Sequence, residues 1–198
     1  MITIVDYGAG NLNSVQKALQ YLGLPNQVSA DVAEVASARA LILPGVGAFG
    51  AAARSLAGLR KVVRSAVASG RPFLGICLGL QLLLASSQED DQAAGLGIIP
   101  GQVIRFAPGL KVPHMGWNTV TYGQESRLFA GIPSGTYFYF VHSYYALPAA
   151  ETIGRTQYGV EFASAISFGN CHAVQFHPEK SGRAGLQLLR NFGEMAGC

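Results

Sequence analysis

Charged residues are scarce in this chain: Asp, Glu, Lys and Arg make up 13% of its 198 residues, whereas 49% are hydrophobic. The formal net charge is +3, and the basic residues are scattered rather than gathered into a stripe. The electrostatic footprint of a nucleic-acid binder is missing, so we exclude nucleic acid as a partner. So many hydrophobic residues require elements that are covered on both sides, which favours a parallel sheet with helices on each face.

The chain also lacks a long hydrophobic run. Its longest nearly apolar stretch, residues 74–85, is interrupted by Gln81 and is too short to span a bilayer. The first residues, "MITIVDYG", have neither the basic start nor the apolar core of a signal peptide. We therefore expect a cytoplasmic protein with no membrane partner.

Cysteine is rare as well, with three residues: Cys77, Cys171 and Cys198. They form neither an even disulfide set nor a C-x-x-C metal spacing, so we expect free thiols and no metal site. The turn "GAGN" contains Gly8 and Gly10, but Asn13 stands where the third glycine of a dinucleotide fingerprint should be. We expect no cofactor.

Short β-type runs alternate with helical patterns in the first half of the chain. The runs are residues 2–5, 40–43 and 72–76, and the first is followed by a glycine turn and a helical pattern over residues 12–22. After about Glu89 strand-like runs dominate, and an amphipathic helix closes the chain. We predict an α/β fold with an open, mostly parallel, doubly wound (flavodoxin-like) sheet and added antiparallel strands in the second half.

No linker divides the sequence, so we expect residues 1–198 to form one domain. In an open parallel sheet, the turns that leave the carboxyl ends of the strands lie along one edge, where ligands bind. Four turns qualify here: "YGAGN", "PGVG", the turn at Cys77, and "FHPE". We expect the chemistry among them.

The segment "GICLG" places Cys77 between Gly75 and Gly79, after a β-type run and before a helical pattern. This is the form and the context of a nucleophile elbow, a strained bend in which side chains at the flanking glycines would collide with backbone. The start of a helix also favours the thiolate. Cys77 is therefore the candidate nucleophile, although a free cysteine is often a small buried hydrophobe.

A cysteine nucleophile needs a base, and the base needs an orienting group. Of four histidines, only His177 has a carboxylate close by, at Glu179. In an extended segment residues two apart point to the same side, and Pro178 favours extended backbone at His177. The alternative is a histidine whose polar atoms are satisfied within a turn.

An oxyanion formed during attack on an acyl group needs preorganised donors. The amide of Leu78, the residue after the nucleophile, is one candidate. The turn "PGVG" leaves a strand at the same edge, and its glycines allow backbone amides to face inward. It is otherwise an ordinary turn.

These motifs resemble the class I, or triad, glutamine amidotransferases, in which G-x-C-x-G and a downstream H-P-E supply cysteine, histidine and glutamate. Within that family, "LPGVGAF", "KVPHMGWN", "FVHSYY" and "VQFHPEKSG" are similar to the glutaminase subunits of imidazole glycerol phosphate synthases, along nearly the whole chain. A second alternative is an amidotransferase subunit of another synthase, such as anthranilate synthase, and the segment "PHMGWN" is the feature that distinguishes the two subunits. A noncatalytic α/β binding module with a structural or redox-sensing cysteine is the third alternative.

The resemblance implies hydrolysis of L-glutamine to L-glutamate and ammonia through a cysteine thioester. It also implies a (β/α)₈-barrel cyclase partner in a heterodimer, which receives the ammonia through a tunnel and converts PRFAR to imidazole glycerol phosphate and AICAR in histidine biosynthesis. Catalysis falls to Cys77, His177 and Glu179, with oxyanion residues Val46, Gly47 and Leu78. Glutamine would be held by Gln81, Glu89, Ser143 and Tyr144, although Asp90 or Asp91 are alternatives to Glu89.

The same resemblance implies a partner interface. Its residues would be Asn11, Pro113, His114, Met115, Trp117, Asn118 and Lys180. On physical grounds alone, the single tryptophan is also compatible with a packing role in the core or against a strand.

Overall fold

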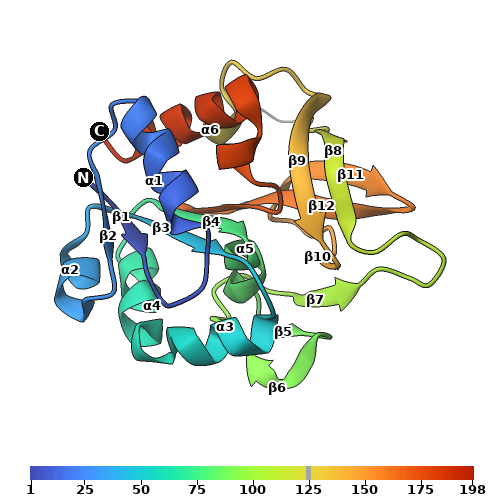
Figure 1. Cartoon of the computed structure of the whole chain (residues 1–198), viewed down its shortest axis with the longest axis horizontal. Coiled ribbons are helices and arrows are strands. Elements are labelled where there is room, and N and C mark those ends of the chain that lie inside the picture. The colour runs from blue at the N-terminus through green and yellow to red at the C-terminus, as the bar shows by residue number, and fades with distance from the viewer. Residues whose placement is uncertain (124–125) are drawn as a thin grey trace.

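A mostly parallel sheet runs through the molecule, with helices on both of its faces (Figure 1). The computed structural model describes residues 1–123 and 126–198. Along one half of the sheet the strand order is β2-β1-β3-β4-β13, and all of these neighbours pair in parallel. Their bounds are Asn26–Ser29 (β2), Ile2–Val5 (β1), Ala40–Gly45 (β3), Phe73–Cys77 (β4) and Cys171–Val174 (β13). This order confirms the predicted doubly wound arrangement.

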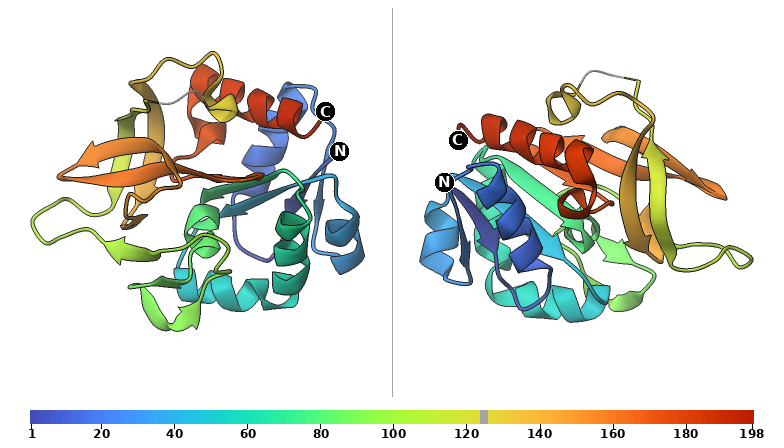
Figure 2. Two further views of the ribbon diagram at one scale, coloured as in Figure 1. Left: turned by 180° about the vertical axis from the view of Figure 1, so that it is seen from behind. Right: turned by 45° about the horizontal axis from the view of Figure 1, so that its top comes forward.

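Helices cover the two faces of the parallel strands. One face carries α1 and α6, and the other carries α2, α3, α4 and α5 (Figures 1 and 2). The helices span Leu12–Tyr21 (α1), Val32–Ser37 (α2), Phe49–Ser55 (α3), Arg60–Ala68 (α4), Leu78–Leu83 (α5) and Gly182–Met195 (α6), with a 3₁₀ turn at Leu56–Gly58. The two chain ends lie near each other on the side of the molecule away from β8 (His114–Val120) and β9 (Thr136–His142) (Figures 1 and 2).

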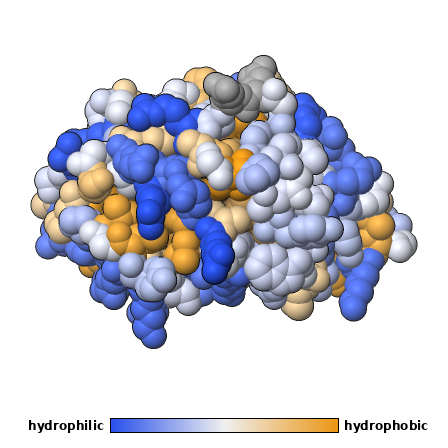
Figure 3. All heavy atoms as spheres, turned by 90° about the horizontal axis from the view of Figure 1, so that it is seen from above, coloured by the Kyte–Doolittle hydropathy of each residue, from blue (hydrophilic) through white to orange (hydrophobic). Residues whose placement is uncertain are grey.

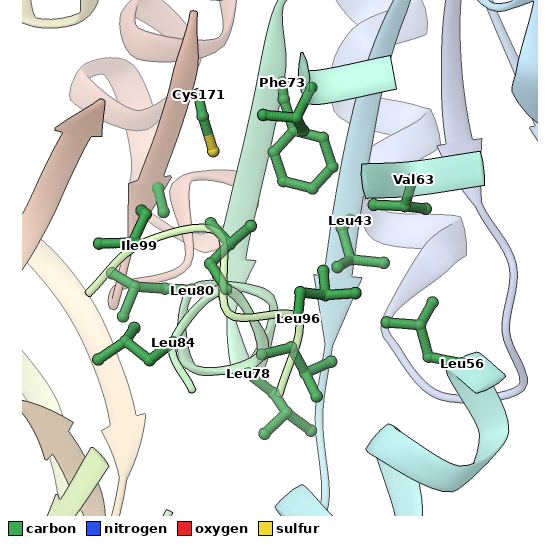
Figure 4. Packing of buried hydrophobic residues seen from close by; sticks show 14 of the residues in the cluster. Leu43, Leu56, Val63, Phe73, Leu78, Leu80, Leu84, Leu96, Ile99 and Cys171 are labelled. Atoms are coloured by element: carbon green, nitrogen blue, oxygen red, sulfur yellow. The ribbon is translucent and has the colours of Figure 1, made fainter. Parts of the chain in front are cut away.

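Alternating side chains of the parallel strands feed two separate hydrophobic clusters. On β3, Leu41 and Leu43 pack toward α4 and α5, whereas Ala40 and Ile42 pack toward α1 and α6. Figure 4 shows the first cluster. Phe73 of β4 lies near Leu43 of β3, and Leu80 of α5 lies below Phe73 in this view. Strands buried on both faces read as continuous apolar runs, as the sequence of β3 and β4 does.

The second half of the chain adds mostly antiparallel strands, as predicted. The sheet continues from β13 through β12, β10, β7, β5 and β6, and β11 pairs with β12. Only β5 and β7 pair in parallel here. The bounds are Ser86–Ser87 (β5), Asp90–Ala94 (β6), Gln102–Arg105 (β7), Tyr144–Ala146 (β10), Thr152–Tyr158 (β11) and Val160–Phe168 (β12), with 3₁₀ turns at Arg127–Phe129 and Pro178–Lys180.

Strands β8 (His114–Val120) and β9 (Thr136–His142) form a separate two-stranded antiparallel sheet that the sequence did not predict. Because side chains alternate along a strand, its two faces differ in character. The inner face is buried and includes Phe138 and Phe140, whereas the outer face exposes Met115, Trp117 and Tyr137.

The surface that carries α1 and α6 mixes hydrophilic side chains with smaller apolar patches (Figure 3). Within the described residues, no helix is both long enough and apolar enough to cross a bilayer.

Candidate active site

Cys77 sits in a strained bend between β4 and α5. Its backbone has φ 54° and ψ −107°, and it is the only non-glycine residue with positive φ in the described part of the chain. A Cβ at Gly75 would come within 2.9 Å of the Gly79 carbonyl group, and a Cβ at Gly79 would overlap the Leu43 carbonyl oxygen. The bend therefore requires glycine on both sides of the cysteine, which is the backbone geometry of a nucleophile elbow.

The Cys77 sulfur borders a cavity and is not sealed in apolar packing. The cavity has a volume of about 230 Å³, and Cys77, at 6% exposed, is part of its lining. Sγ accepts a hydrogen bond from Gln175 Nε2 at 3.6 Å and lies 3.8 Å from the Val141 carbonyl oxygen. The sulfur therefore makes polar contacts in the wall of this cavity.

His177 and Glu179 meet beside this cysteine because β13 pairs with β4. The two side chains are joined by a hydrogen bond of 2.8 Å between His177 Nδ1 and Glu179 Oε1, and each is 1% exposed. His177 is extended, with φ −101° and ψ 97°, as expected before proline. The next residues, however, form a 3₁₀ turn rather than the expected extended run, so the carboxylate reaches the ring across a turn.

The electrostatics of His177 reflect its two neighbours. Burial alone lowers its pKa, but the nearby Cys77 and Glu179 side chains outweigh that cost and raise it. Nε2 of His177 is buried without a hydrogen-bond partner, and so is Oε2 of Glu179. A buried imidazole with one nitrogen fixed by a carboxylate and the other unpaired can accept and return a proton.

The predicted oxyanion residues Val46, Gly47 and Leu78 line the same cavity. β3 pairs with β4 so that Gly45 lies opposite Cys77, which brings the turn "PGVG" to the elbow. Gly47 has φ 98°, and Val46 is 42% exposed. Leu78 opens α5, so its amide has no partner within the helix and is available to an anion.

The predicted substrate residues Gln81, Glu89, Ser143 and Tyr144 also line the cavity. Nε2 of Gln81 donates to the Tyr144 carbonyl oxygen (3.0 Å) and to Gln175 Oε1 (3.2 Å), so its oxygen is the atom left for a ligand. Oε2 of Glu89 accepts the Phe49 amide at 2.8 Å. The neighbouring acids are placed elsewhere, since Asp90 forms an ion pair with Arg54 (3.1 Å) and the cavity lining includes neither Asp90 nor Asp91.

The residues expected at a partner interface do not share one face. Met115 and Trp117 are 62% and 56% exposed on the outer face of β8, Lys180 is exposed after the triad, and Pro113 lines the cavity. Asn11 is half-buried just before α1. His114 and Asn118, by contrast, lie on the inner face, and His114 is only 4% exposed. Strand alternation therefore places these two side chains on the face opposite Trp117.

Sequence reasoning missed other residues at the site. Gln175 contacts the sulfur, His142 and Val141 line the cavity, and Tyr137 is exposed on the outer face of β9. The signal for Gln175 was a single glutamine inside the apolar run before "HPE". Among the described residues, no group of three or more His, Cys, Asp and Glu side chains is arranged to hold a metal ion.

Comparison with known proteins identifies the family that this chain matches. A family model described as glutamine amidotransferase class-I matches residues 3–195. The chain is 55% identical to the imidazole glycerol phosphate synthase subunit HisH of Moorella thermoacetica, covering 98% of this chain and 94% of the relative. It is 54% identical to the HisH subunit of Methanothermobacter thermautotrophicus, covering 98% of each chain.

Solved structures share the fold at lower sequence identity. A crystal structure of a glutamine amidotransferase aligns with a TM-score of 0.79 at 21% identity and covers 100% of both chains. The glutaminase domain of Trypanosoma brucei CTPS, solved with bound acivicin, aligns with a TM-score of 0.69 at 16% identity and covers 98% of this chain and 93% of that one.

Proposed function

This chain belongs to the class I glutamine amidotransferase family, and we propose that it is the glutaminase subunit of an imidazole glycerol phosphate synthase. It hydrolyses L-glutamine to L-glutamate and ammonia in histidine biosynthesis. One observation carries the assignment of the active site: the strained Cys77 borders a cavity beside a buried His177–Glu179 pair.

In the proposed mechanism, Cys77 Sγ attacks the side-chain amide carbon of glutamine. The oxyanion that forms is stabilised by the Leu78 amide and by a backbone amide of the turn containing Val46 and Gly47. His177, oriented by Glu179, takes the proton of the Cys77 thiol and passes it to the amide nitrogen. The C–N bond then breaks, ammonia leaves and a thioester remains on Cys77. His177 then takes a proton from water as the water attacks the thioester. The C–S bond breaks, glutamate leaves, and His177 returns the proton to the Cys77 sulfur.

The cavity has a size that suits a free amino acid. At about 230 Å³ it is smaller than the 300 to 1,000 Å³ usual for drug-sized ligands. Gln81 Oε1 and the Glu89 carboxylate present acceptors to an α-ammonium group, and the backbone at Ser143 and Tyr144 borders the other side. We assign these residues to the α-substituents of glutamine.

The partner in this proposal is a (β/α)₈-barrel cyclase subunit that receives the ammonia. The outer face of the β8–β9 sheet suits such a contact because Met115, Trp117 and Tyr137 are exposed there next to the cavity residue Pro113. Exposed aromatic and methionine side chains are enriched at interfaces. Lys180 adds an exposed cation after the triad.

The decisive test replaces the nucleophile in the assembled enzyme. We expect Cys77→Ala to abolish glutamine-dependent synthesis of imidazole glycerol phosphate and to preserve ammonia-dependent synthesis. Cys198→Ala, a substitution at an exposed thiol, is the matched control and should retain both activities. Loss of both activities in Cys77→Ala would contradict a role limited to ammonia supply, and retained glutamine-dependent synthesis would contradict the nucleophile assignment.

A further inference from the structure

A hydrogen-bonded chain starts at Asn118 on β8, and backbone groups fix its direction. Oδ1 of Asn118 accepts the Thr119 amide at 2.8 Å, and its Nδ2 donates to the Gln157 carbonyl oxygen at 3.0 Å. The side-chain amide is therefore oriented by one backbone donor and one backbone acceptor. The second hydrogen on Nδ2 points to His114 Nε2, 3.2 Å away, which must act as the acceptor.

Two buried histidines continue the hydrogen-bonded chain, each donating away from Asn118. Because His114 accepts at Nε2, its Nδ1 carries the proton and donates to His142 Nε2 at 3.0 Å. His142 in turn donates from Nδ1 to the Tyr144 carbonyl oxygen at 2.8 Å. Burial lowers the pKa of His114 to about 4 and that of His142 to about 3, which agrees with two neutral rings of defined tautomer.

The chain then reaches the sulfur through two glutamines. The Tyr144 carbonyl oxygen also accepts from Gln81 Nε2, whose other hydrogen goes to Gln175 Oε1. With its oxygen used in this way, Gln175 presents Nε2 to Cys77 Sγ at 3.6 Å. Gln175 is 0% exposed and Gln81 is 5% exposed, so water does not compete for these bonds.

We infer that Gln175 is a further catalytic residue, an N–H donor to the Cys77 sulfur. The chain from Asn118 through His114 and His142 holds the Tyr144 carbonyl oxygen in place, and Gln81, which donates to that oxygen and to Gln175 Oε1, aims the donor. The inference rests on the proposed function, because a donor to sulfur matters only where the thiolate is the nucleophile. A fixed N–H in a buried site stabilises the negative charge on sulfur. His177 and Tyr7 are titratable neighbours of Cys77, whereas Gln175 supplies a neutral contact to the sulfur that does not move with the proton.

The first test measures alkylation of Cys77 by iodoacetamide as a function of pH, in the full chain, with peptide mass spectrometry as the readout. Gln175→Met keeps the length of the side chain but removes the donor. We expect alkylation near neutral pH to slow about tenfold and the midpoint of the rate–pH curve to move to higher pH. Gln187→Met, which removes a side-chain donor to Asn191 on α6, is the matched control and should alkylate like the wild type.

The second test acts at the far end of the chain. Asn118→Asp replaces the donor to His114 with an acceptor, which reverses the hydrogen-bond direction through both histidines. His142 Nδ1 then faces the Tyr144 carbonyl oxygen as a second acceptor, and the repulsion displaces the oxygen that orients Gln81. We expect slower alkylation of Cys77, while Asn170→Asp, at another half-buried asparagine that donates to backbone carbonyls, should have no effect. This variant also decides the question if Gln175→Met fails to fold.

Slower alkylation in the folded variants, with unchanged controls, supports the inference. An unchanged rate in either folded variant overturns it. Glutamine hydrolysis by the assembled wild-type enzyme is measured in parallel, and its absence would instead refute the proposed function. Retained hydrolysis together with unchanged alkylation in Gln175→Met would refute only the role of Gln175.

Discussion

We predict that mild acid destabilises this protein through His172, a buried histidine on β13. The ring is 7% exposed, and its Nδ1 lies 2.9 Å from Ser167 Oγ on the neighbouring strand. Burial, helped by the positive charge of Arg127, lowers its pKa to about 4. In the unfolded chain the pKa of histidine is about 6.5, so the unfolded state binds a proton first as the pH falls.

The sign and size of the effect follow from this difference. A lowered pKa in the folded state means that the contribution of His172 to stability is complete above about pH 6.5 and is lost as the pH falls toward about 4. Between about pH 8 and about pH 5, the loss is about 2 kcal/mol for a folded pKa of about 4. This is a large share of the stability of a typical domain.

Urea unfolding at both pH values measures the effect, with His172→Gln as the comparison. Glutamine retains a polar side chain but cannot be protonated, so the variant should lose about 2 kcal/mol less than the wild type on acidification. The absolute stability of the variant does not matter, because the quantity compared is the change with pH. Equal pH dependence in the two proteins would refute the reasoning that His172 is neutral when folded.

Three further outcomes test the elbow, the base and the proposed interface. Gly79→Ala should destabilise the fold by at least about 2 kcal/mol in the same assay, because the added Cβ overlaps a backbone carbonyl; a stability equal to that of the wild type would contradict the tight bend. His177→Asn should slow glutamate release at least about a hundredfold in a coupled assay and leave ammonia-dependent synthesis intact, and retained turnover would exclude His177 as the base. Trp117→Ala should weaken assembly with the partner subunit by about tenfold or more in a titration, since exposed tryptophans are frequent hot spots, whereas unchanged affinity would remove Trp117 from the interface.

The parallel half of the fold and its active-site turns could be predicted from local patterns. The apolar runs of β3 and β4 and the helical spacing of α1 are short-range features. Glycine at positions 75 and 79 indicates a tight bend, because any larger side chain there would collide with the backbone. Each of these signals depends on neighbours close in sequence, so one chain is enough to recognise it.

The separate β8–β9 sheet could not be predicted in the same way, because it depends on pairing between strands far apart in the chain. Period-two alternation along "HMGWN" already places His114 and Asn118 on the face opposite Met115 and Trp117. The role of Gln175 needed coordinates, because its partners Gln81 and Cys77 lie 94 and 98 residues away in sequence.

The order of strands β3, β4 and β13 separates the proposed oxyanion turn from the Cys77–His177 pair. Cys77 ends β4 and His177 follows the neighbouring strand β13, so the pairing of these two strands brings sulfur and imidazole together. The turn with Val46 follows β3, on the opposite flank of β4. In the proposed mechanism, a change in the shape of that turn alters turnover while Cys77 and His177 keep the positions that the sheet gives them. The loop after β3 is then the place where selection, or an engineer, would tune the rate.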